Sequence, residues 1–570
     1  MADHRLDIED AHAHRLRLTL KLARPAREQR LALAAWAPGS YLLRDFARHV
    51  VQISAQQGER PVALEQVDKS SWLARCEGRG ALVVTLIVYA FDDSVRGAFV
   101  DAQRAFVNGP AVFLRAVGRE AEPQRLTLGP LPRGWDVATA LRRTGPRRYE
   151  AADHAELIDH PIALGPCWRG RFDAGGAAHE IALSGAWPGF DGTRLVDDLR
   201  RICEAQVRFW HGAKGRPPFE RYLFLVHASE DGYGGLEHRA STAISCARRH
   251  LPRHGMAEAG DGYLGLLALL SHEYFHAWNV VRMRPAELAA PDLQAEAYTR
   301  LLWFYEGVTS YYDELMLLRA GLVDPARYLQ LLARPINAML ATPGRRWQSL
   351  AQASFEAWTR FYKRHEGSAN SNVSYYDKGS VVALLADLAL RARGRSLDEV
   401  MRTLWKRAAR GPVGEAEIVH ALGPEVAPEV MAWVHGTDEL PLSARLAAAG
   451  IALRSAEPGF AARVGLKLSE GALSGVQVRQ VLGGSAAEAA GMSPNDEVIG
   501  VAGWRVRRFD EALQWVDPAK PFDVLVARDQ RLHTLTLRAP AAPLPGTLSL
   551  RPDERAAGAA LALRQAWLGD

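Results

Sequence analysis

The spacing of apolar residues changes twice along this 570-residue chain, and that change limits the possible folds. Leucines at positions 16, 18, 20 and 22 alternate with polar residues, as in a half-buried strand. Gly/Pro turns separate further strand-like runs at 30–36, 81–91, 111–117 and 125–128. The pattern predicts an antiparallel β domain over about 1–170. It contains no catalytic constellation, so we expect it to support its neighbour.

Helical spacing dominates the middle of the chain. After an expected helix at 191–211 and an expected strand at 221–229, periodic segments follow around 262–282, 294–320, 323–342 and 376–393. A β-rich part begins near residue 445. A chain of this length exceeds what one hydrophobic core can hold. We predict a multidomain α+β protein with a β-sandwich-like domain (1–170), a mainly helical domain (171–440), a second β domain (441–545) and a partly loose tail (546–570).

Composition excludes several classes of protein. The 70 basic and 65 acidic residues leave a net charge of +5, spread without a basic stripe, so no nucleic-acid partner is expected. The four cysteines lack CxxC spacing, which favours buried free thiols: Cys76, Cys167, Cys203 and Cys246. The charged N-terminus is unlike a signal peptide, and no run reaches the roughly 20 apolar residues of a membrane span. We expect a cytoplasmic protein without a membrane partner, and oligomerisation stays open.

The segment SHEYFHAWN, 271–279, carries the strongest chemical signal. On a helix, His272 and His276 project from one face and are spaced to share a metal such as zinc. Glu273 lies beside that position, where a carboxylate can take a proton from an activated water. An HExxH pattern arises by chance in roughly a few per cent of chains this long, so other residues must support it.

A catalytic zinc requires a third protein ligand. Glu306 lies in the apolar and aromatic segment WFYEGVTSYYDE, where an unpaired carboxylate would be costly to bury. The spacing suits a second helix that presents Glu306 to one zinc ion per chain. Glu296 and Glu314 are the competing ligands. The alternative without a metal is a solvent-facing glutamate on an amphipathic helix.

Two more segments suggest how a peptide substrate is held. Gly234 and Gly235 precede Glu237 in GYGGLEH, as in an edge strand that binds an extended peptide, and Glu237 could meet the peptide's ammonium group. A surface turn is the alternative. In SYYDKG, the hydroxyl of Tyr376 could donate to the oxyanion of the reaction, although tyrosines at helix starts usually serve packing.

Together, HEYFHAWN, FYEGVTSYY, GYGGLEH, YYDKG and the early segment WAPGSYLLRDFARHV resemble the bacterial glycyl aminopeptidase family, gluzincins distantly related to aminopeptidase N. The resemblance implies a thermolysin-like catalytic domain, one zinc and removal of small N-terminal residues such as Gly or Ala. It also implies site roles: zinc ligands His272, His276 and Glu306, general base Glu273, exopeptidase glutamate Glu237 and oxyanion donor Tyr376. Leu236 and His238 depart from the relatives' G-x-M-E-N motif.

The C-terminal β part resembles that family's PDZ domain. Residues 475–506 predict a strand, a small-residue helix over 485–490, a turn at Gly491 and a second strand. A groove near 465–468 could take a peptide or protein ligand, although Lys467 and Leu468 depart from the usual G-Φ-G-Φ loop. The alternative is a module that only packs on the catalytic domain or mediates oligomers.

The sequence therefore predicts a zinc-dependent aminopeptidase acting on peptides with a free N-terminus. One alternative is a zinc endopeptidase to which the PDZ-like domain delivers chains. The other is a binding protein with an inert metal domain, which the intact Glu273 disfavours.

Overall fold

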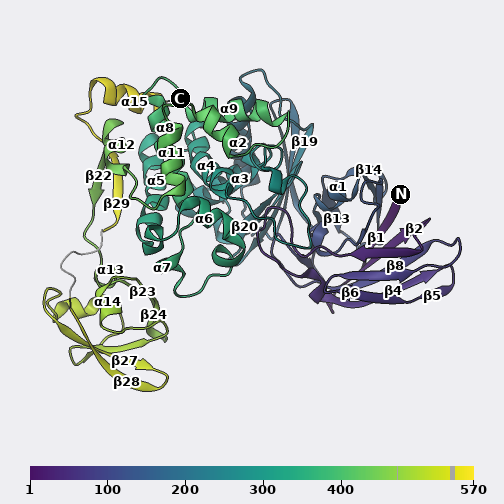
Figure 1. Ribbon diagram of the computed structural model, residues 1–570, viewed down its shortest axis with the longest axis horizontal. Helices are drawn as coiled ribbons and strands as arrows, with labels where there is room; N and C mark the ends of the chain where they lie inside the picture. Colours follow the sequence, from purple (N-terminus) through teal and green to yellow (C-terminus); the bar gives the residue numbers. More distant parts are fainter. Residues whose placement is uncertain (472, 539–545, 570) are drawn as a thin grey trace. The chain divides into compact units, whose positions relative to one another are not determined.

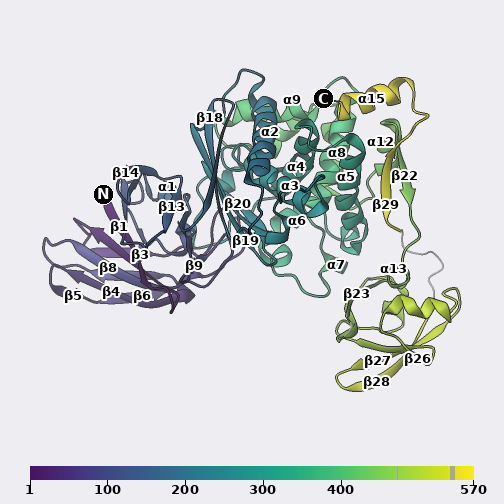
Figure 2. The same cartoon turned by 180° about the vertical axis from the view of Figure 1, so that it is seen from behind.

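A computed structural model describes residues 1–471, 473–538 and 546–569. The chain forms two compact units, the first made of Met1–Tyr298 with Leu404–Val413 and the second of Thr299–Thr403 with Gly414–Asp570. The fold is multidomain α+β, with an N-terminal β domain and a helical domain, and its elements can be followed by colour in Figures 1 and 2.

The N-terminal part of the first unit consists almost entirely of strands. An eight-stranded sheet has the order β14-β15-β12-β1-β2-β8-β4-β5, and two four-stranded sheets have the orders β13-β16-β10-β9 and β11-β3-β7-β6. The strands are β1 (Ala2–Asp10), β2 (Arg15–Leu22), β3 (Glu28–Ala32), β4 (Val50–Gln57), β5 (Arg60–Val62), β6 (Leu64–Asp68), β7 (Ser71–Arg75), β8 (Leu82–Tyr89), β9 (Ala98–Val100), β10 (Ala105–Val107), β11 (Arg115–Ala116), β12 (Gln124–Leu128), β13 (Asp136–Thr139), β14 (Arg142–Gly145), β15 (Arg148–Ala151) and β16 (Ile162–Gly165).

The alternating leucines of β2 are buried, as their period of two predicts, and help to form the core of this domain. The pairings are antiparallel except that β1 pairs with β12 in parallel. The expected strand at 111–117 is wrong, because the chain forms a 3-10 turn at Gly109–Ala111 and only the two-residue strand β11. Pro110 has no N–H for a strand ladder, and the apolar side chains of this segment fill the core instead.

A mixed sheet follows in the first unit, with the order β17-β18-β19-β21-β20. Strands β18, β19 and β21 run parallel, while β20 lies antiparallel to β21 at the edge. Helix α3 packs against α2 and β20. The elements are α1 (His154–Ile158), β17 (Trp168–Ala174), β18 (Ala177–Ser184), α2 (Gly192–His211), β19 (Arg221–Ser229), β20 (Tyr233–Glu237), β21 (Ser241–Ala247) and α3 (Asp261–Phe275). The expected helix at 191–211 and strand at 221–229 are confirmed as α2 and β19.

The second unit begins with a helical layer in which α8 packs against α4 and α5. Its helices are the π-helical turn η5 (Trp303–Gly307), α4 (Val308–Arg319), α5 (Pro325–Leu340), α6 (Leu350–Phe355), α7 (Ser368–Ser371), α8 (Asp377–Arg391), α9 (Leu397–Ala408), α10 (Glu415–Leu422), α11 (Ala427–His435) and α12 (Leu442–Ala448). Residues Leu404–Ala408 of α9 belong to the first unit. Helix α8 is almost entirely buried, which explains why its sequence is apolar on several sides.

A further sheet near the C-terminus has the order β23-β24-β25-β27-β28, with β26 paired to β25 and β23 at one edge. The elements are α13 (Phe460–Val464), β23 (Leu466–Gly471), β24 (Gly475–Val481), α14 (Ala486–Ala489), β25 (Glu497–Val501), β26 (Trp504–Arg505), β27 (Phe522–Arg528) and β28 (Arg531–Leu537). They surround a core of their own. The PDZ assignment of this part stays a prediction, and its expected end, 539–545, lies outside the described residues.

The C-terminal segment differs from the partly loose tail that its composition predicts. Strand β29 (Leu548–Pro552) pairs with β22 (Ile451–Ser455), and α15 (Gly558–Leu568) follows. Trp567 is fully buried, and its indole N–H donates to the hydroxyl of Tyr311 at 3.0 Å. The expectation was wrong because about half of this segment is apolar, and Leu550, Trp567 and Leu568 are buried. Asp570 lies outside the described residues. None of the described helices is both long and apolar enough to cross a membrane.

Candidate active site

Helix α3 brings the two histidines of the HExxH segment together. His272 lies in its last turn, and His276 follows directly as its C-terminal cap. Their rings are buried, with centroids 4.6 Å apart and planes at 86°. The spacing of four residues therefore places both imidazoles on one face, as the sequence predicts.

The hydrogen bonding of His276 suits a metal ligand. Its Nδ1 lies 2.8 Å from the carbonyl oxygen of Asn279, so Nδ1–H donates to that oxygen and Nε2 keeps its lone pair. Metal-binding histidines commonly have such a partner, which sets the tautomer and the ring orientation. Two buried imidazoles on one helix face form a donor set that fits Zn²⁺.

Two carboxylates lie next to this helix end. Potential ligand atoms of Glu237, Glu273 and His276 all lie within 4.8 Å of one another, and all three residues are buried. Glu237 ends the edge strand β20, while Glu273 comes from α3. The first unit thus places the predicted base and the predicted exopeptidase glutamate beside one of the predicted zinc ligands.

The strand of Glu237 approaches α3 so closely that a side chain is excluded at one position. A Cβ at Gly235 would lie 2.0 Å from Oε1 of Glu273. The Gly235 carbonyl accepts a hydrogen bond from Nη2 of Arg96 at 3.0 Å. Gly234 has φ +151°, a backbone conformation that favours glycine. Both predicted glycines therefore have a steric or conformational reason.

Sequence reasoning missed Gly39, in the WAPGSY segment of the N-terminal β domain. Its φ is +83°, and a Cβ there would lie 2.5 Å from Oε1 of Glu237. The prediction that this domain only supports its neighbour is therefore incomplete. The Pro38-Gly39-Ser40 turn was the available signal, but nothing in the sequence indicates that it meets a residue about 200 positions away.

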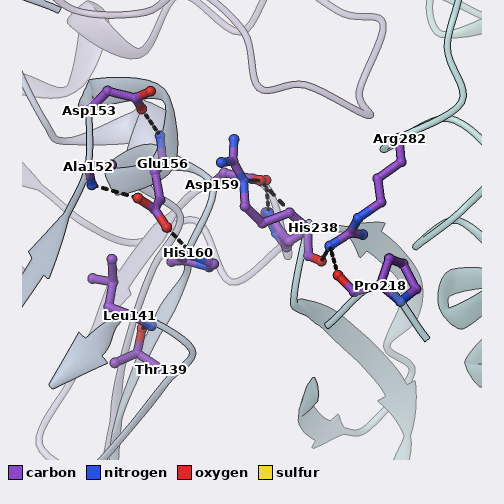
Figure 3. A network of polar contacts seen from close by, with 11 residues as sticks. Thr139, Leu141, Ala152, Asp153, Glu156, Asp159, His160, Pro218, His238 and Arg282 are labelled. Atoms are coloured by element: carbon purple, nitrogen blue, oxygen red, sulfur yellow. Dashed lines mark hydrogen bonds and ion pairs between the residues drawn. The ribbon is translucent and has the colours of Figure 1, made fainter. Parts of the chain in front are cut away.

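A polar network holds the turn that follows Glu237 (Figure 3). Asp159, just after α1, lies 3.1 Å from Nδ1 of His238 and 2.7 Å from Nε of Arg239. Burial alone would raise the pKa of Asp159, but the hydrogen bond from His238 and the charges of His238 and Arg239 outweigh it and hold the pKa well below its usual range. The network ties the N-terminal β domain to the end of β20.

The second unit carries Glu306 and Tyr376. Glu306 is buried in the π-helical turn η5, a type of helix distortion often found at functional sites. Tyr376 precedes α8, which crosses η5 where a Cβ on Gly307 would lie 2.6 Å from Cα of Gly379. Burial raises the pKa of the Tyr376 hydroxyl well above its usual value, and the charge of Glu306 adds to the rise. Glu306 and Tyr376 are thus near neighbours.

The two adjacent tyrosines differ in their exposure to solvent. Tyr375 is fully buried, whereas Tyr376 is only half-buried. Each hydroxyl lies 3.3 Å from the hydroxyl of Tyr362. A substrate could reach Tyr376 but not Tyr375.

Two other glutamates were competing candidates for the third zinc ligand. Glu296 lies in a loop of the first unit. Glu314 lies on α4, where burial raises the pKa of its carboxyl group to about 8.

Family models match two parts of the chain: the M61 glycyl aminopeptidase model covers residues 265–382, and the Peptidase M61 N-terminal domain model covers residues 3–166. The crystal structure of an aminopeptidase N family protein from Idiomarina loihiensis is 31% identical, with a TM-score of 0.93 and 100% of both chains covered. The chain belongs to the M61 glycyl aminopeptidase family.

More distant structures include an M1 zinc metallopeptidase from Deinococcus radiodurans, at 14% identity and a TM-score of 0.47, covering 77% of this chain and 94% of that one. No curated protein matches the chain. Family membership supports an aminopeptidase-type metallopeptidase function.

Proposed function

We propose that this M61 family member is a zinc-dependent aminopeptidase in which His272, His276 and Glu306 hold one zinc ion. The observation that carries the proposal is the pair of buried histidines on α3, with Nδ1 of His276 bonded to the carbonyl of Asn279 and Glu273 beside the pair. Zinc, when bound, supplies a Lewis acid that polarises the scissile carbonyl and lowers the pKa of a water molecule.

The chain's own residues perform the remaining steps. Glu273 takes a proton from the attacking water and returns it to the leaving amine. Tyr376 donates a hydrogen bond to the carbonyl oxygen as negative charge develops on it. The peptide lies extended along the edge strand β20, where Gly234 and Gly235 allow close approach, and Glu237 binds its free ammonium group.

The substrates we propose are peptides with a small N-terminal residue such as Gly or Ala, acted on in the cytoplasm. The glycyl aminopeptidase family model supports this preference. Glu237 supports cleavage at the first residue, because it lies beside the predicted base and carries the charge that an ammonium group needs. An endopeptidase, in contrast, would not depend on a free N-terminus.

For the C-terminal part we propose a PDZ-like domain that adds an extended peptide to the edge strand β23. The contacts of Asn370 on α7 favour the alternative, in which this part only packs on the catalytic domain. The side chain of Asn370 donates to the carbonyl of Val481 and accepts from the N–H of Gly483, both at 2.8 Å. Titration of the full chain with C-terminal peptides separates the two roles.

The decisive experiment combines metal analysis with turnover of aminoacyl and N-acetylaminoacyl amides. The purified protein should hold one zinc ion and hydrolyse only the free-amine substrates. Glu306→Ala should lose zinc affinity by more than the roughly 10–100-fold typical of a residue behind a ligand. An unchanged zinc affinity of this variant would show that Glu306 is not a zinc ligand.

Two further variants separate the remaining roles. Glu237→Ala should keep zinc, which distinguishes Glu237 from Glu306 as the third ligand. Glu273→Gln should keep zinc and lose turnover, because the base is lost but no ligand is. Near-normal activity of that variant would show that Glu273 is not the base.

A further inference from the structure

A cavity of about 560 Å³ lies within the first unit. The N-terminal β domain, the end of β20 and the loop after α3 line it together. Its apolar lining includes Trp36, Tyr41, Pro110, Val280, Leu288 and Leu293. The volume is in the range of small-molecule pockets and far exceeds what a glycine or alanine side chain fills.

The cavity lies next to the residue that we propose binds the N-terminal end of the substrate. The described lining residues include Glu237 but neither His272 nor His276. In the proposed function, the scissile bond lies at the histidines and the ammonium group at Glu237. The only part of the peptide that can extend from there into the cavity is the side chain of its first residue.

Most charged groups around this cavity already have partners. Arg115 lies 3.7 Å from Glu120, and Arg239 lies 2.7 Å from Asp159. Arg282 donates to carbonyl oxygens, including those of Ala277 and Arg239, both at 2.7 Å. Figure 3 shows Arg282 pointing toward the Asp159 network.

Arg284 is different. It lines the cavity and is half-buried, yet within the described part of the chain no carboxylate lies at ion-pair distance from its guanidinium and no acceptor forms a hydrogen bond with it. Burial lowers its pKa, with the charge of Arg239 acting in the same direction and that of Asp159 opposing. A guanidinium nevertheless stays protonated, so the cavity contains a positive charge with which no described carboxylate pairs directly.

A strained turn presents this arginine. Val280, four residues after His276, has φ +91°, which is rare for a β-branched residue. Its N–H donates to the carbonyl of Met283 at 2.9 Å, which closes a tight turn before Arg284. Such strain persists only where the surrounding structure maintains it, and it is common at binding sites.

We propose that this cavity is the pocket for the first residue's side chain and that Arg284 makes the enzyme accept peptides beginning with Asp or Glu, in addition to Gly and Ala. The proposal rests on the proposed aminopeptidase function. Glycine and alanine use only the Glu237 end of the pocket. An acidic residue also pairs its carboxylate with Arg284 through a charge-assisted hydrogen bond.

The test compares each acid with its neutral isostere. Aminoacyl amides of Asp, Asn, Glu, Gln, Gly and Ala are assayed with the zinc-loaded full-length protein. We expect kcat/KM for Asp or Glu to exceed that of its amide partner on the order of 10-fold, the effect of one hydrogen bond to a charged group. Equal or lower values, with Gly and Ala hydrolysed, overturn this inference and leave the proposed function intact. No hydrolysis of any amide by the zinc-loaded protein overturns both.

Variants then assign the preference to one side chain. Arg284→Gln should bring the acid-to-amide ratio close to one, and Arg284→Lys should retain part of it. Arg115→Gln is the matched control in the lining of the same cavity, and it should keep the ratio because Glu120 already pairs with that arginine. A ratio that survives Arg284→Gln overturns the assignment. If Arg284→Gln does not fold, free glutamate should still inhibit the unmodified enzyme more strongly than glutamine, and equal inhibition overturns the proposal.

Discussion

Replacing Gly235 by alanine tests the geometry of the proposed base through a single methyl group. The added Cβ would lie 2.0 Å from Oε1, 2.4 Å from Cδ and 2.6 Å from Cγ of Glu273. Gly235 has no left-handed backbone conformation, so alanine introduces no backbone strain there. The carboxylate of Glu273 must therefore move while the strand stays in place.

The size of the effect follows from that overlap. Ordinary van der Waals contact begins near 3.4 Å, so Glu273 must shift by on the order of 1 Å. A displacement of that size can lower a catalytic rate about 100-fold, and complete loss of a general base costs roughly 10²–10⁴-fold. We expect kcat to fall by about 100-fold or more, with zinc content unchanged because no proposed ligand moves.

The assay measures kcat on glycyl amides together with zinc content and the thermal unfolding midpoint. Gly265→Ala is the control, because it makes the same substitution on the helix that carries Glu273, at a site where the new Cβ would meet no described atom within 4 Å beyond the backbone of its own helix. It should keep full activity and stabilise the helix by up to about 1 kcal/mol. A Gly235→Ala enzyme with normal kcat would show that Glu273 does not act from this position.

Three further changes probe neighbouring contacts. Tyr376→Phe should lower kcat about 10²–10³-fold with little change in substrate affinity, whereas Tyr375→Phe, at a fully buried position, should affect mainly stability; the reverse outcome would exchange their roles. Gly39→Ala should raise KM for free-amine substrates, because its Cβ displaces the carboxylate of Glu237, and an unchanged KM would contradict this contact. Asp159→Asn should lower the urea-unfolding midpoint at pH 7. Because the native pKa of Asp159 is depressed, its stabilisation is fully present above the unfolded pKa of about 3.9, declines below that pH and is lost as the pH falls through the native pKa. A difference between the two proteins that is as large at pH 2 as at pH 7 would be evidence against the ionic contribution.

Local patterns in the sequence determined most of the elements and the arrangement of the two HExxH histidines. The alternating leucines predicted β2, the helical spacing predicted α2 and α8, and the interval of four between His272 and His276 predicted their shared face. Each of these depends on near neighbours in the chain. A side chain's direction repeats with the period of its own helix or strand, so residue spacing alone is enough to predict it.

Only the tertiary structure determined which segments far apart in the sequence come into contact. Gly39 lies against Glu237, Gly235 against Glu273, and Arg284 beside a cavity that also has walls from the N-terminal β domain. Sequence patterns also failed at 111–117, where apolar residues fill a core and only the two-residue strand β11 forms, and in the tail, where buried Trp567 anchors an Ala- and Arg-rich segment. An apolar composition indicates that a segment is buried, but it does not indicate which other segment it packs against. Which surfaces meet depends on the packing of the whole chain.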